Sequence, residues 1–149
     1  MGISLLGPIW LLLLVAALIG TIVWCITRKH YTSLTWRGIS ASVMPGVIMV
    51  GTFYALAIHM HASLGGWPKT IGEAGFPPDL VTHANWTFWY FEAMLLTVLF
   101  AWPIALIVSS LVPRLRRFIA HLSLFAGSSA LCFGLMLLGP SQFLYWWWD

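Results

Sequence analysis

The feature that most constrains this chain is a series of long apolar stretches separated by short polar connections. The first of them, residues 5–26, contains no charged side chain. A helix of about 20 apolar residues is long enough to cross a hydrocarbon core of about 30 Å. Each stretch of this kind is therefore predicted to cross a lipid bilayer as a helix.

The composition excludes an ordinary water-soluble domain. Hydrophobic residues make up 60% of the chain and charged residues 7%, whereas soluble domains average about 25% charged residues. Because these few charged residues could not cover the surface of a soluble protein, we expect the chain to lie in a lipid bilayer. No nucleic-acid partner is expected, because the net charge of +3 is better explained by membrane orientation and anionic lipid.

The predicted fold class is all-α, a polytopic membrane protein with a bundle of four transmembrane helices. The whole chain, residues 1–149, is expected to form one transmembrane domain. The only long polar connection is rich in Gly and Pro and is predicted as an outer loop over residues 62–85. The predicted spans are residues 5–26, 39–58, 86–112 and 118–138.

Proline and aromatic residues refine these boundaries. Pro77 and Pro78 followed by Asp79 suit the first turn of a helix, so the third span could begin earlier than Trp86. Pro103 is expected to kink that span. The aromatic tail, residues 143–149, is predicted to be an interfacial anchor.

The basic residues indicate an orientation, because cytoplasmic connections of membrane proteins hold Lys and Arg in excess. Six of the seven basic residues lie in the first and third connections; they are Arg28, Lys29, Arg37, Arg114, Arg116 and Arg117. We therefore expect both termini and the long loop to lie on the non-cytoplasmic side, with a bacterial cytoplasmic (inner) membrane as the expected location. Arg114, Arg116 and Arg117 are also candidates for binding anionic lipid headgroups.

Five polar residues in the predicted outer half are the candidates for chemistry: His59, His61, His83, Asp79 and Glu92. A carboxylate facing lipid is costly, so Glu92 is expected to face the bundle or a wet cavity. Asp79 and His83 have the spacing that places two side chains on one helix face. Two histidines with one or two carboxylates could bind zinc, copper or iron. His59 and His61, however, would point about 200° apart on one helix.

These observations favour a non-catalytic accessory or scaffolding subunit of a larger membrane assembly. Small residues four apart in the last span, Ala126, Ala130 and Gly134, suit close helix packing, mainly within the bundle, and the partners expected are lipid and other subunits or a second copy. The alternative is a membrane oxidoreductase or metalloprotein with a His/carboxylate site for a metal, haem or quinone at the outer interface. No motif in the sequence specifies a reaction.

Overall fold

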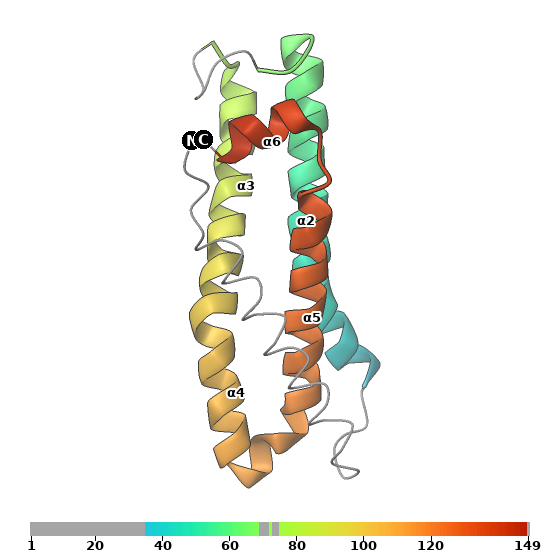
Figure 1. Ribbon diagram of the computed structural model, residues 1–149, viewed down its shortest axis with the longest axis vertical. Coiled ribbons are helices and arrows are strands. Elements are labelled where there is room, and N and C mark those ends of the chain that lie inside the picture. Colours follow the sequence, from blue (N-terminus) through green and yellow to red (C-terminus); the bar gives the residue numbers. More distant parts are fainter. Residues whose placement is uncertain (1–34, 69–71, 73–74, 149) are drawn as a thin grey trace. The chain divides into compact units, whose positions relative to one another are not determined.

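The computed structural model describes residues 35–68, 72 and 75–148. These residues form helices and no strand, so the predicted all-helical class is confirmed for this part of the chain (Figure 1). The elements are α2 (Trp36–Leu64), α3 (Pro78–Leu96), the π-helix η1 (Thr97–Ala101), α4 (Trp102–Leu111), the 3-10 helix η2 (Pro113–Phe118), α5 (Ile119–Met136) and α6 (Ser141–Trp148).

Three helical stretches in the described residues are long and apolar enough to cross a membrane. They are Trp36–Leu64, Pro78–Leu111 and Pro113–Met136, and they correspond to the second, third and fourth predicted spans. Large apolar side chains are exposed along them, as lipid-facing residues of an integral membrane protein would be. The first predicted span, residues 5–26, lies outside the described residues, so the count of four remains a prediction.

The helices on either side of the long connection extend further than the predicted spans. α2 ends at Leu64 rather than near residue 58, and α3 begins at Pro78 rather than Trp86. Pro77 is extended, Pro78 occupies the first helical turn and Asp79 follows it. Proline suits this position because the first turn has no internal partner for its backbone nitrogen. The stretch between the two helices, residues 65–77, is consequently shorter than the predicted loop, residues 62–85.

Pro103 lies just after a local widening of the helix. The backbone forms the π-helix η1 before α4 begins at Trp102. Proline has no N–H for the helical ladder, and insertion of a π-helical turn is a common adjustment where the ladder is interrupted. The sequence predicted a disturbance here, and its form is a π-helical turn.

The described residues group into two compact units. Unit 1 contains residues 35–43 and 98–130, and unit 2 contains residues 44–68, 72, 75–97 and 131–148. The helices α2 and α5 each contribute residues to both units.

In unit 1, the start of α2 and the helix α4 each bond to α5. Trp102 Nε1 donates a hydrogen bond to the Leu122 carbonyl at 2.9 Å. Ser128 Oγ donates to the Ser42 carbonyl at 3.1 Å. Thr35 Oγ1 accepts a hydrogen bond from Gly38 N at 3.2 Å and so caps the start of α2. These bonds satisfy three polar side chains of unit 1 and link α2 and α4 to α5.

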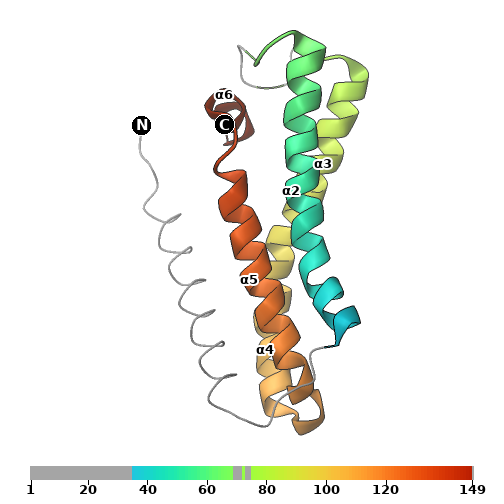
Figure 2. The same ribbon diagram turned by 90° about the vertical axis from the view of Figure 1, so that its right-hand side faces the viewer.

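In unit 2, the short helix α6 supplies much of the core. Figures 1 and 2 show α6 turned across the direction of α2 and α3. Its residues Phe143, Trp146 and Trp147 are buried, and Phe143 and Trp147 contact Phe53 of α2. The tail was predicted to be an interfacial anchor; Phe143, Trp146 and Trp147 of this tail pack inside the unit, whereas Tyr145 and Trp148 are 57% and 47% exposed.

Candidate histidine site

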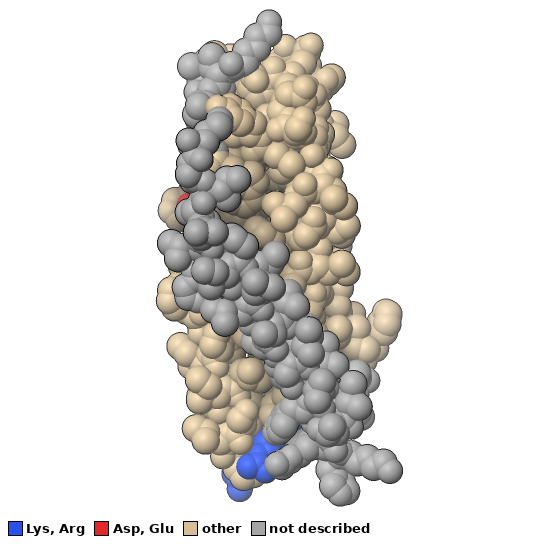
Figure 3. Space-filling model, viewed as in Figure 1, with Lys and Arg blue, Asp and Glu red and all other residues tan. Residues whose placement is uncertain are grey.

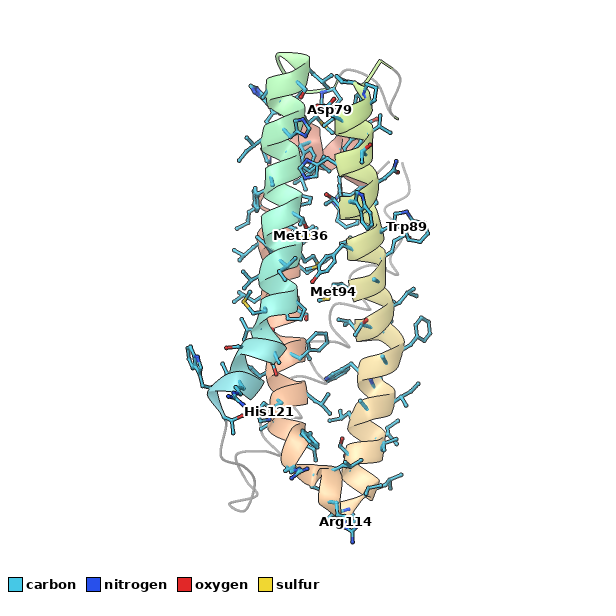
Figure 4. The ribbon with its side chains drawn as sticks, turned by 180° about the vertical axis from the view of Figure 1, so that it is seen from behind. Asp79, Trp89, Met94, Arg114, His121 and Met136 are labelled. Atoms are coloured by element: carbon cyan, nitrogen blue, oxygen red, sulfur yellow. The ribbon has the colours of Figure 1, made fainter. Side chains whose placement is uncertain are left out.

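The structure brings three of the five predicted site residues together in unit 2. His59 lies near the end of α2, while Asp79 and His83 lie in the first turns of α3. Figure 4 labels Asp79 at this end of α3. The early start of α3 at Pro78 places Asp79 and His83 on one helix, at the spacing that the sequence analysis considered.

The two imidazoles form a direct pair. His59 Nδ1 and His83 Nδ1 are 2.9 Å apart, and the ring centroids are 5.2 Å apart. One nitrogen must donate its proton and the other must accept with its lone pair, so the pair requires at least one neutral imidazole. The bond therefore links α2 to α3 and depends on protonation.

Asp79 extends the pair on the side of His59. Its Oδ2 atom is 3.4 Å from His59 Nε2. An N–H on His59 Nε2 leaves Nδ1 of a neutral His59 as the acceptor, and His83 is then the donor. The Asp79 side chain is 70% exposed and that of His59 31%, so solvent reaches this contact and weakens it.

The other two predicted residues lie elsewhere. The His61 ring packs against Trp67, with centroids 4.7 Å apart. His59 and His61 therefore have different partners, as the angle between them on a helix predicted. Glu92 lies further along α3 with an exposed side chain. Its predicted position facing the bundle or a wet cavity stays a prediction, because the first predicted span lies outside the described residues.

The distances in the cluster suit hydrogen bonding better than metal binding. Two nitrogens bound to one tetrahedral zinc ion lie about 3.3 Å apart, given Zn–N bonds of about 2.0–2.1 Å. The 2.9 Å separation of the His59 and His83 nitrogens is that of a direct hydrogen bond. Within residues 35–68, 72 and 75–148, no three His, Cys, Asp or Glu side chains are grouped so that they could hold a metal ion.

Unit 2 also contains a cluster of packed aromatic rings that the sequence analysis did not predict. Phe88 of α3 stacks on Trp147 of α6 with centroids 4.2 Å apart and ring planes 9° from parallel. Phe91 meets Trp147 edge to face, and Trp146 Nε1 donates to the Gly72 carbonyl at 3.1 Å. The spacings Phe88–Phe91 and Phe143–Trp146–Trp147 are the sequence signal, because such residues share a helix face.

Comparisons of the chain with protein-family models, with curated proteins and with solved structures find no match.

Proposed function

We propose that the chain is a non-catalytic accessory or scaffolding subunit of a larger membrane assembly. In this proposal it is a four-helix protein of a bacterial cytoplasmic membrane, with both termini and the connection between α2 and α3 on the non-cytoplasmic side. The basic residues of the first and third connections support that orientation. The partner is either another subunit or a second copy of the chain.

The observation that supports the proposal best is the position of Glu92. It is exposed on α3, and its neighbours on that face, Trp89 and Leu96, are 69% and 57% exposed. No ion pair joins Glu92 to another residue of the described chain. Figure 4 shows Trp89 projecting outward from the helix. An acidic side chain on an outward apolar face suits a protein partner that supplies a cation or a hydrogen-bond donor.

The length of the span containing α3 supports the same interpretation. Pro78–Leu111 is 34 residues long, whereas a bilayer needs about 20. Exposed Trp86 and Trp89 are typical of the belt at the membrane interface, so Glu92 lies within one turn of that belt on its membrane side. Near this boundary the hydrocarbon excludes water but an adjoining protein surface can provide hydrogen bonds.

Site-specific photocrosslinking in native membranes tests this proposal. A photoreactive residue in place of Trp89 is expected to give one discrete protein adduct, which Glu92→Gln weakens. The matched control is a photoreactive residue in place of Ile58, which is 70% exposed on α2 and is expected to give lipid adducts alone. Lipid adducts alone from position 89, together with a lone monomer in mild detergent, would reject the subunit role.

The second candidate function is a membrane oxidoreductase or metalloprotein, and the proximity of His59, His83 and Asp79 is the observation behind it. Here His59, His83 and Asp79 would hold a metal or haem after the imidazoles separate, or donate to a quinone carbonyl. Elemental analysis and a visible absorption spectrum of the purified protein test the metal and haem versions. A stoichiometric metal or haem lost in His83→Ala, but retained in His61→Ala, would replace the subunit proposal with this one.

A further inference from the structure

Unit 1 contains an apolar cavity that neither candidate function uses. Its volume is about 630 Å³, within the range of roughly 300–1,000 Å³ typical of ligand pockets. The start of α2, the helix α4, the turn η2 and the helix α5 all contribute to its walls. Its lining residues include Ala41, Ala105, Ser109, Phe118 and His121.

The charge of unit 1 is entirely of one sign. Within its described residues, 35–43 and 98–130, there are four arginines and no Asp or Glu. Three of the arginines occupy η2, where Figure 3 shows the blue Lys and Arg atoms gathered. No carboxylate of the same unit can neutralise them, so the charge complement must come from outside the described part of unit 1.

Two of these arginines are held beside the cavity wall. Arg116 Nε donates to the Ser110 carbonyl at 3.2 Å, next in sequence to the lining residue Ser109. The Arg117 guanidinium lies 4.9 Å from the centre of the Phe118 ring, itself a lining residue. Arg114 and Arg117 are both exposed and Arg116 is half-buried, but no contact to a lining residue involves Arg114, which Figure 4 shows at the turn. Arg116 and Arg117 keep further N–H groups for an anion, since a guanidinium has five.

The cavity wall also contains an unsatisfied polar group. Both ring nitrogens of His121 are buried and have no hydrogen-bond partner. The ring lies against Gly38, so closely that a Cβ on that residue would overlap Nε2. The imidazole therefore closes the cavity wall between α2 and α5 and does not present a nitrogen to the cavity.

We propose that unit 1 binds one anionic glycerophospholipid, with its phosphate on Arg116 and Arg117 and an acyl chain in the cavity. The apolar walls accept the acyl chain, and the two arginines favour a lipid with a negatively charged headgroup. The inference uses the membrane orientation proposed above, since anionic lipids are enriched in the cytoplasmic leaflet, and it does not depend on whether the chain joins a larger assembly.

Native mass spectrometry of the full-length protein, delipidated in detergent, tests the proposal. Phosphatidylglycerol and phosphatidylcholine with the same acyl chains are titrated in parallel. We expect one phosphatidylglycerol to bind at least about tenfold more tightly than phosphatidylcholine, consistent with two charge contacts. Equal binding of the two lipids would overturn the proposal, as would several equivalent phosphatidylglycerol sites.

Variants separate the headgroup from the chain. The double variant Arg116→Gln, Arg117→Gln is expected to remove the preference for phosphatidylglycerol and leave phosphatidylcholine binding unchanged, while Arg114→Gln changes the preference less than about twofold. Ala105→Trp, which fills the cavity, is expected to weaken the binding of both lipids. If it does not fold, Ala41→Phe fills the cavity from α2. The assignment is contradicted if the arginine double variant keeps the preference for phosphatidylglycerol. It is also contradicted if the cavity variant binds both lipids as tightly as wild type.

Competition identifies the ligand class. Millimolar inorganic phosphate is expected not to displace the lipid, because it lacks the acyl chain. Displacement by phosphate would show a simple anion site, and displacement by a short-chain neutral quinone would show a site for carbonyl compounds. Either result overturns the lipid assignment. A membrane complex found by crosslinking at position 89 would leave it unaffected, so the two proposals fail separately.

Discussion

Gly38 of α2 and His121 of α5 lie so close together that a Cβ on Gly38 would overlap the Nε2 and Cδ2 atoms of the imidazole. The glycine is required here by the approach of a side chain rather than by its backbone conformation. Gly51 on the same helix has no atom within 4 Å of the equivalent Cβ position. Two glycines of one helix therefore have different roles.

Gly38→Ala is expected to lower the free energy of unfolding by about 1–3 kcal/mol, because the His121 ring must move into a less favourable position. Gly51→Ala should leave stability unchanged or raise it by up to about 1 kcal/mol, since alanine favours the helix. Unfolding in mixed detergent measures both. Adding His121→Ala to Gly38→Ala should recover part of the loss, and strict additivity of the two changes would contradict the contact.

The His59–His83 bond gives unit 2 a dependence on pH. It needs at least one neutral imidazole, so its stabilisation is present at neutral and alkaline pH and is lost as the pH falls and both rings become charged. We expect a loss of about 1 kcal/mol between pH 7.5 and pH 5, typical of one hydrogen bond. Unfolding measured across this range should show the loss in wild type.

Substitution at His59 and at His61 distinguishes the origin of this pH dependence. His59→Asn should remove most of it, whereas His61→Asn should retain it because His61 packs on Trp67. Asp79→Asn should make the loss steeper, since the carboxylate offsets a positive charge on His59. Equal pH dependence in wild type and His59→Asn would show that other groups cause it.

Among the elements, α6 contributes more to the core than its eight residues suggest. The chain enters it through Gly139, where a Cβ would lie 3.2 Å from the Met136 carbonyl and from Phe53. Trp147 is 5% exposed and contacts rings of both α2 and α3. Through these aromatic contacts α6 joins α2 and α3 in the core of unit 2.

Trp147→Ala is expected to cost about 3–5 kcal/mol of unfolding free energy, as large core aromatics generally do. Trp147→Phe should cost less, since its buried Nε1 has no hydrogen-bond partner to lose. Trp86→Ala is the matched control: this tryptophan is 72% exposed and should cost under about 1 kcal/mol. Similar losses for Trp147→Ala and Trp86→Ala would show that α6 is not part of the core.

The elements also show which features could be predicted from the sequence. Apolar length and local Pro and Gly signals predicted the helical spans, the first turn at Pro78 and the disturbance near Pro103. The role of the tail could not be predicted, because tryptophan is equally suited to an interface and to a core. The pairing of His59 with His83 depends on the approach of two helices, which spacing along one helix cannot supply.

For the whole molecule, the charge distribution is the property that relates it to its surroundings. The three arginines of η2 face no carboxylate in the described part of unit 1, and all described acidic residues belong to unit 2. Orientation by the positive-inside rule depends on Lys and Arg near the ends of the spans. The same arginines therefore set the proposed orientation and provide the proposed lipid contacts.

Cysteine labelling in intact cells tests the orientation, after replacement of the native Cys25 and Cys132. A membrane-impermeant maleimide should label Ser63→Cys and Ser141→Cys directly, and Val112→Cys only after permeabilisation. The reverse pattern would place the basic turns outside. Replacing Arg114, Arg116 and Arg117 by Asn removes half of the six basic residues assigned to the cytoplasmic side. That change should let Val112→Cys label partly in intact cells, because the remaining charge bias no longer fixes one orientation.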